Sequence, residues 1–280
     1  FFTSLKLKPT PMMPNHFKFF LTLGFLITLT TSGFSQGVSM SPTRLFLTGN
    51  PGEKVTETVI LNNSSDKDYV FNINVKDWKR ELDGNKIYSE PGSLDTSNAS
   101  WISTFENTVS VPAKSTQEIL VTMTIPKDAS PSALTNSMLF FTQISTQADK
   151  AQTQNGIGII ALFEFGLHVY YTPTGNQINS MEITAIEEIN DAISQEKKIA
   201  VSVINDGNIV NDATVQFELT NTETGEEIKL DSKAMSSMPG TEQVIYFTLP
   251  TSISGQYLGV TIIKMSGTND LRVGEKTFDF

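Results

Sequence analysis

The sequence has no cysteine and only two histidines, His16 and His168. Without cysteine it cannot form disulfides, zinc–thiolate sites or a cysteine nucleophile, so its stability must come from hydrophobic cores. His168 is the only histidine beyond the N-terminal segment 1–36. A multi-histidine metal site is therefore excluded, and so is a Ser-His-Asp triad built around any other histidine.

Positive charge is also scarce. The chain carries 20 basic and 30 acidic side chains, a net charge of −10 at pH 7. Residues 1–36 hold three of the lysines and no acidic residue, so the remainder has a net charge of −13. A chain this acidic repels a phosphate backbone, which argues against a nucleic-acid partner.

The N-terminal segment has the layout of a secretory signal peptide. From Met13 it runs through a cationic stretch with Lys18, an apolar run over Phe19–Leu29 and small polar residues up to Gln36. The apolar run is about a dozen residues, well short of the ~20 that a membrane-spanning helix needs. We predict that 1–36 is a signal peptide with an upstream extension. The chain would then be exported to the periplasm or cell envelope, with no permanent membrane anchor.

The remainder of the sequence has the pattern of an all-β protein. Helical periodicity is nearly absent, and short alternating or β-branched runs recur between turn residues. We predict two immunoglobulin-like β-sandwich domains, 37–173 and 178–280, joined by the short linker Pro173–Gln177. The predicted strands are Val38–Leu47, Val55–Asn62, Tyr69–Trp78, Lys86–Ser89, Asn107–Val111, Thr116–Ile125, Asn136–Ser145 and Ile157–Tyr171, then Met181–Glu187, Lys197–Asn205, Ala213–Thr220, Glu227–Leu230, Gln243–Leu249, Gln256–Met265 and Arg272–Phe280.

The strand predicted over Ile157–Tyr171 is unusually long. It has fifteen residues with an apolar side chain at every odd position, whereas strands usually have about five or six. One interpretation is a core strand that continues into the linker. The other is that its first half offers an apolar edge to another polypeptide by strand addition. The candidate binding residues are then Ile157, Ile159, Ala161 and Phe163.

Three segments resemble one known family. The opening run Val38–Phe46 contains an arginine, Ser137–Phe141 precedes a polar loop, and the long strand closes on Val169–Pro173. Together they resemble the PapD-like periplasmic pilus-assembly chaperones over roughly Val38 to Pro173. The resemblance implies two immunoglobulin-like domains whose long strand lends apolar side chains to an incomplete pilus subunit. It also implies that an arginine and a lysine hold the subunit's terminal carboxylate, without any cofactor.

Two residues of this chain correspond to those anchors. Arg44 matches the family's arginine, although its alternative role is that of a surface arginine near a strand end. The family's lysine position falls on His168, so the second anchor has changed. An ordinary histidine, with a pKa near 6.5, is mostly neutral at pH 7. Because a bound carboxylate would raise that pKa, we expect client affinity to strengthen as the pH falls through about 6.5.

These observations indicate binding rather than catalysis. The first hypothesis is an envelope chaperone or assembly factor that binds a secreted or fimbrial subunit by strand addition. The resemblance also implies an usher as a second candidate partner. The alternative is a structural or adhesive cell-envelope binding protein built of immunoglobulin-like domains. An enzyme is not expected, because the carboxylates are scattered along the sequence and no metal or cofactor motif is present.

If the signal-peptide prediction is right, the mature protein begins at or near Gln36 or Gly37 and fractionates with soluble periplasmic proteins. N-terminal sequencing of the secreted form measures this directly. Recovery of the full-length chain in the inner membrane would contradict it.

Overall fold

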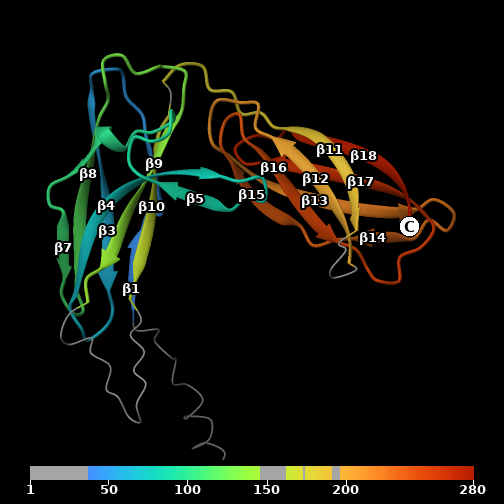
Figure 1. The fold of residues 1–280 in the computed structure, drawn as a ribbon, viewed down its shortest axis with the longest axis horizontal. Coiled ribbons are helices and arrows are strands. Elements are labelled where there is room, and N and C mark those ends of the chain that lie inside the picture. Colours follow the sequence, from blue (N-terminus) through green and yellow to red (C-terminus); the bar gives the residue numbers. More distant parts are fainter. Residues whose placement is uncertain (1–36, 146–161, 173, 191–195) are drawn as a thin grey trace, which may run out of the picture. The chain divides into compact units, whose positions relative to one another are not determined.

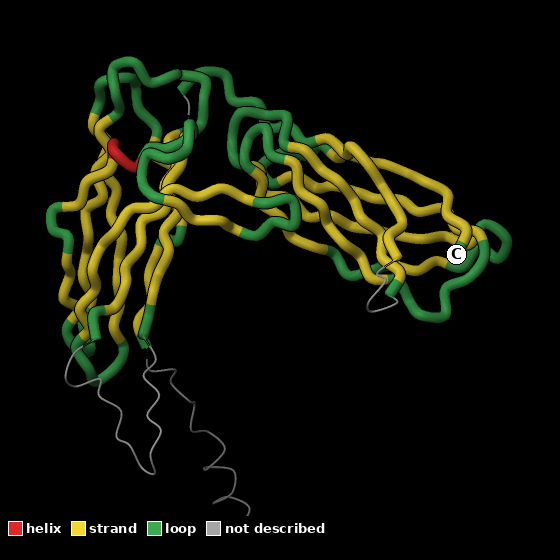
Figure 2. The backbone as a smooth tube through the Cα atoms, in the orientation of Figure 1, coloured by secondary structure: helices red, strands yellow, loops and turns green. Residues whose placement is uncertain are grey.

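The computed structural model describes residues 37–145, 162–172, 174–190 and 196–280, and the predicted signal peptide lies outside them (Figure 1). In these residues the regular structure is almost entirely strand, with one short 3-10 helix over Ala99–Trp101 (Figure 2). Four sheets form two sandwiches within the compact unit 38–280, which confirms the predicted fold class. None of the described helical structure is long and apolar enough to cross a membrane.

The first sandwich packs a four-stranded sheet against a six-stranded one. The smaller sheet has the order β1-β3-β8-β6, and the larger has β2-β10-β9-β4-β5 with β7 also paired to β4. The strands are β1 (Val38–Ser41), β2 (Arg44–Leu47), β3 (Lys54–Asn63), β4 (Tyr69–Arg80), β5 (Lys86–Ser89), β6 (Ile102–Thr104), β7 (Thr108–Val111), β8 (Thr116–Thr124), β9 (Thr135–Gln143) and β10 (Glu164–Tyr171).

The second sandwich has a three-stranded sheet, β11-β12-β16, and a five-stranded sheet, β14-β13-β17-β18 with β15 paired to β13. Its strands are antiparallel throughout the described pairs. They are β11 (Glu182–Asn190), β12 (Lys197–Ile204), β13 (Asn211–Asn221), β14 (Glu227–Lys229), β15 (Lys233–Ser237), β16 (Glu242–Thr248), β17 (Gln256–Met265) and β18 (Leu271–Asp279).

Each sandwich has its own hydrophobic core, as alternating strands require. In β13 every second residue from Asn211 to Leu219 is buried, because successive side chains point to opposite faces. Phe71, Phe141 and Tyr171 lie fully buried in the first core, and Phe217 fills the second. A third, smaller cluster surrounds Trp78 on the outer face of the larger first sheet.

The structure differs from the sequence prediction at four places. The predicted strand Val38–Leu47 is split into β1 and β2, which belong to different sheets, because Pro42 between them lacks a backbone N–H. The short strands β6 and β15 were not predicted, since β6 has only three residues and β15 contains no β-branched or aromatic residue. The strand predicted from Ile157 begins only at Glu164 in the described residues. The domain limits 37–173 and 178–280 stay predictions.

A buried asparagine stabilises the turn after β3. Asn63 is 1% exposed, and its Nδ2 donates to the carbonyl oxygens of Lys67, Val111 and Pro112 at 2.7, 3.1 and 2.9 Å. Its Oδ1 accepts hydrogen bonds from the backbone N–H and the hydroxyl of Ser65. One side chain therefore satisfies backbone groups from two separate loops.

The second sandwich uses the same arrangement after β12. Asn205 is fully buried, and its Nδ2 donates to the carbonyl oxygens of Ile209 and Ser237, both at 2.9 Å. Its Oδ1 accepts from the backbone N–H of Gly207 at 3.0 Å and from Asn211 Nδ2 at 3.2 Å. Equivalent turns in the two sandwiches are thus held by equivalent hydrogen bonds.

Replacing Asn63 by alanine should reduce the free energy of unfolding by about 2 to 4 kcal/mol, because several buried carbonyl groups would lose their partner. Asn62→Ala is the matched control. Asn62 is exposed and accepts one hydrogen bond from Thr116, so its loss should cost about 0.5 kcal/mol or less. Chemical denaturation of both variants measures the difference, and equal effects would contradict the role given to Asn63.

Candidate binding site

Strand β10 is open on one side over its first half. Along its whole length it pairs with β9, from Glu164 opposite Thr142 to Tyr171 opposite Thr135. On its other side the parallel strand β2 begins only at the pair of His168 with Arg44. Among the described strands, none pairs with Glu164–Leu167 on that side, so this stretch is a free sheet edge.

Within the described part of the chain, the backbone groups along this edge have no strand partner. The N–H of His168 donates to the carbonyl of Thr43 at 3.1 Å, on the β2 side of β10. Because backbone groups alternate in direction along a strand, those of Gly166 and Glu164 also face this side. Their N–H and C=O groups are therefore available to a further strand.

The second half of β10 is packed on both faces, whereas Glu164 at its start is exposed and Phe165 and Gly166 are partly buried. Leu167, Val169 and Tyr171 point into the first core and are fully buried. On the opposite face Tyr170 is 1% exposed and meets Trp78 at 6.2 Å between ring centroids. The strand is thus a rigid support for an added strand.

The four apolar candidates predicted from the sequence lie before this strand. Phe163 is 37% exposed, and its ring lies 5.6 Å from that of Tyr69 and 6.1 Å from that of Phe165. It therefore covers the rim of its own core, and its backbone carbonyl accepts from the N–H of Gln143 at 2.9 Å. The other three, Ile157, Ile159 and Ala161, lie outside the described residues, and the binding role of all four stays a prediction.

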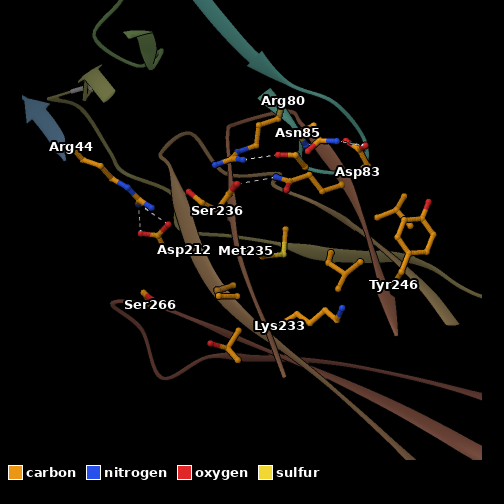
Figure 3. Close-up of a pocket in the computed structure, with 17 residues that line it drawn as sticks. Arg44, Arg80, Asp83, Asn85, Asp212, Lys233, Met235, Ser236, Tyr246 and Ser266 are labelled. Carbon is orange, nitrogen blue, oxygen red and sulfur yellow. Dashed lines mark hydrogen bonds and ion pairs between the residues drawn. The ribbon is translucent and has the colours of Figure 1, made fainter. Parts of the chain in front are cut away.

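Arg44 is the first residue of β2 and forms an ion pair with Asp212 of β13. Its Nη1 donates to Oδ1 and Oδ2 of Asp212 at 2.8 and 2.7 Å (Figure 3). The hydrogen bond raises the pKa of Arg44 against the effect of burial. Burial raises the pKa of Asp212, but hydrogen bonds from Arg44 and Ser236 outweigh it and hold that pKa below its usual value. Only Nη1 of the guanidinium is occupied by Asp212, so its other donors remain for a second carboxylate.

His168 lies beside Arg44, but it does not provide a charge. Its ring is 4.9 Å from that of Trp78, and neither ring nitrogen has a hydrogen-bond partner among the described residues. Burial, followed by the charges of Lys86, Arg44 and Arg80, lowers the pKa of His168 to about 4. The imidazole of the folded chain without a client is therefore neutral at pH 7, and the expected rise in client affinity at lower pH stays a prediction.

A cavity of about 720 Å³ opens next to Arg44 (Figure 3). Arg80 and Lys233 contribute further positive charge to its wall, while Asp83 and Asp212 contribute negative charge. In the described part of the chain no three histidine, aspartate or glutamate residues come together as a metal site. The cavity wall therefore offers charged groups of both signs to an ionic ligand.

The sequence did not indicate Asp212, Arg80 or Lys86. Asp212 is 168 positions from Arg44, and the contact follows from the packing of strands that are distant in the sequence. Arg80 and Lys86 are brought together by the register of the hairpin between β4 and β5. The Asp83-Gly84 turn predicted this hairpin, but not the direction of its side chains.

The chain matches solved structures of periplasmic pilus chaperones over most of its length at low sequence identity. The class 5 fimbriae chaperone CfaA has a TM-score of 0.48 at 13% identity, covering 86% of this chain and 99% of that chain. The Pseudomonas aeruginosa CupB2 chaperone has 0.46 at 8%, covering 85% and 98%. The periplasmic chaperone SfaE has 0.42 at 12%, covering 86% and 98%. No protein-family model matches the chain, and no curated protein sequence matches it.

The neutral state of His168 should make stability depend on pH. The unfolded chain binds a proton at this residue below about pH 6.5, whereas the folded chain does so only near pH 4. Stability is therefore lost as the pH falls through this window. After allowance for solvent screening, the loss should be about 1 to 3 kcal/mol.

His168→Phe keeps a ring against Trp78 but cannot be protonated. Between pH 7.5 and pH 4.5 the free energy of unfolding should fall in both proteins. The fall should be smaller in His168→Phe than in the unmodified protein, by about 1 to 3 kcal/mol. Denaturant titrations at several pH values measure this difference. Parallel curves for the two proteins would mean that His168 is accessible to protons in the folded state.

Proposed function

We propose that this chain is an exported envelope chaperone or assembly factor that binds a strand of a secreted or fimbrial client protein. The observation that carries the proposal is the free edge of β10 at Glu164–Leu167, which ends at Arg44. An extended client segment would add to this edge through main-chain hydrogen bonds, and its side chains would give specificity. Such binding needs neither a cofactor nor a catalytic group.

The direction of the client strand follows from β2. Strand β2 runs parallel to β10 and starts at Arg44, so it leaves Glu164–Leu167 of β10 uncovered. A client strand placed in line with β2 would pair with this uncovered stretch. If the added strand also runs parallel to β10, its C-terminal end reaches Arg44. The guanidinium can hold a terminal carboxylate through two hydrogen bonds, and it keeps its charge at any pH of the envelope.

The chemistry of the edge supports this binding mode. A Cβ at Gly166 would point toward Met138, with Sδ 3.3 Å away, and so a side chain here would leave the edge itself open to a neighbouring strand. Phe163 and Leu162, at the start of the edge, are 37% and 49% exposed. They add apolar surface where a client strand would begin.

A short peptide of generic sequence tests the proposal, whatever the natural client is. The probe is a labelled peptide of about eight residues in which valine and threonine alternate, with a free C-terminal carboxylate. Gly166→Pro removes an N–H that faces the free edge, a change that edge strands tolerate. It should weaken binding about tenfold or more, as measured by fluorescence anisotropy.

Gly166→Ala is the matched control, because it adds a Cβ at the same place and keeps the N–H. It should bind within about threefold of the unmodified protein, and circular dichroism should show that both variants are folded. Equal binding by the Gly166→Pro variant and the unmodified protein would place the site elsewhere. No binding of the peptide to the unmodified protein would contradict strand addition itself.

A further inference from the structure

Two basic side chains lie directly opposite each other in the hairpin of β4 and β5. Arg80 and Lys86 are Cα partners in the antiparallel pair. Both lie over the ring of Trp78, with Arg80 Cζ and Lys86 Nζ each 5.6 Å from its centroid. Cation–π contacts stabilise this arrangement, but like charges directly opposite each other on two strands are destabilising.

Neither cation has a carboxylate partner among the described ion pairs. Arg80 Nη1 donates to the carbonyl oxygen of Gly84 at 2.7 Å, while its buried Nε has no partner there. Burial lowers the pKa of Arg80. Burial and then the charges of Arg80 and Arg44 lower the pKa of Lys86. Both positive charges are therefore held in place at a cost in stability.

These cations belong to the same neighbourhood as Arg44. Arg44 and Arg80 line one cavity, and Lys86 is the charge that acts most strongly on His168. The negative charge of Asp212 raises the pKa of both Arg44 and Arg80. Asp83, the other acidic residue of the cavity, already accepts hydrogen bonds from Asn85. Positive charge is thus in excess in a chain whose net charge is −10.

We infer that Arg80 and Lys86 form the second cationic part of a carboxylate site shared with Arg44, and that its ligand is the C-terminal carboxylate of the client strand. The inference rests on the proposed function. A carboxylate here would give Arg80 Nε a partner and would screen the repulsion between the three cations. The hairpin would then supply the charge that neutral His168 cannot provide.

The first arm of the test uses acetate and does not depend on strand addition. The chain has two tryptophans, so Trp101→Phe leaves Trp78 as the only fluorescent one. At constant ionic strength, acetate replacing chloride should change the Trp78 emission with saturation. Arg80→Gln and Lys86→Gln should each weaken this response about threefold or more. Arg80→Lys should keep most of it, because it keeps the charge.

Lys79→Gln is the matched control for charge. It removes the same charge from the neighbouring position of β4, whose exposed side chain points to the opposite face from Trp78 and Arg80. Its acetate response should equal that of the Trp101→Phe parent. A response that is insensitive to both Arg80→Gln and Lys86→Gln, or that Lys79→Gln reduces equally, would overturn the inference.

The second arm compares the alternating peptide as free acid and as C-terminal amide. The acid should bind the unmodified protein about tenfold more tightly, and Arg80→Gln or Lys86→Gln should reduce this ratio about threefold each. If the peptide binds but the ratio is unchanged in both variants, the inference is wrong while strand addition stands. If neither peptide binds but the acetate response still depends on Arg80 and Lys86, strand addition is wrong and the carboxylate site stands.

Discussion

The parallel pairing of β2 with the second half of β10 is the constraint on which the candidate site depends. The chain runs along the smaller sheet as β1, passes Pro42, and enters the larger sheet at Arg44. Proline cannot donate a hydrogen bond to a strand ladder, so the change of sheet falls at this point. A β2 that began several residues earlier would cover the edge of β10 and would move Arg44 away from its end.

The electrostatics of the site follow from where this pairing ends. His168 is the first residue of β10 to meet β2, and it is enclosed by Trp78 and by cations from two other strands. Protonating it would add a further positive charge to a desolvated cluster, which is why its pKa falls to about 4. The positive charge is instead carried by Lys86 and by two arginines, and arginine stays charged over the whole range of envelope pH.

Sequence reasoning predicted most strands, because alternating side chains and turn glycines mark them locally. The Asp83-Gly84 turn marks the hairpin of β4 and β5, and Gly84 has the positive φ, 84°, that this position favours. The family resemblance identified Arg44 and His168, whose adjacency the register then produces. The resemblance could not supply Asp212, since that ion pair joins strands far apart in the chain. The contacts of His168 and Tyr170 with Trp78 join strands far apart in the chain, so no local pattern could predict them.

The last strands of the two sandwiches, β10 and β18, have different surroundings on their unpaired sides. Both sandwiches nevertheless use a buried asparagine to hold an equivalent turn. Strand β18 pairs with β17 on one side only, and two of its side chains donate hydrogen bonds to carbonyl groups of the segment that contains β11. Lys276 Nζ donates to the carbonyl of Ile186 at 2.7 Å, and Arg272 Nε donates to that of Met181 at 3.0 Å. One carbonyl group of β11 and one just before it are thus bound internally, and side chains that cover an edge are one way that proteins protect it.

Free edge stretches also occur in the smaller sheet of the first sandwich, where β1 and β6 cover only parts of β3 and β8. Those stretches carry Lys54 and Glu57 on β3 and Glu118 on β8, and the edge of β10 likewise carries Glu164, so charge on the strand does not distinguish these edges. Neither of them ends at an arginine. The edge of β10 differs because its uncovered stretch ends beside Arg44, the first residue of β2. A free edge alone would bind extended chains without distinction, and in the proposed binding mode the positive end would select a strand that terminates there.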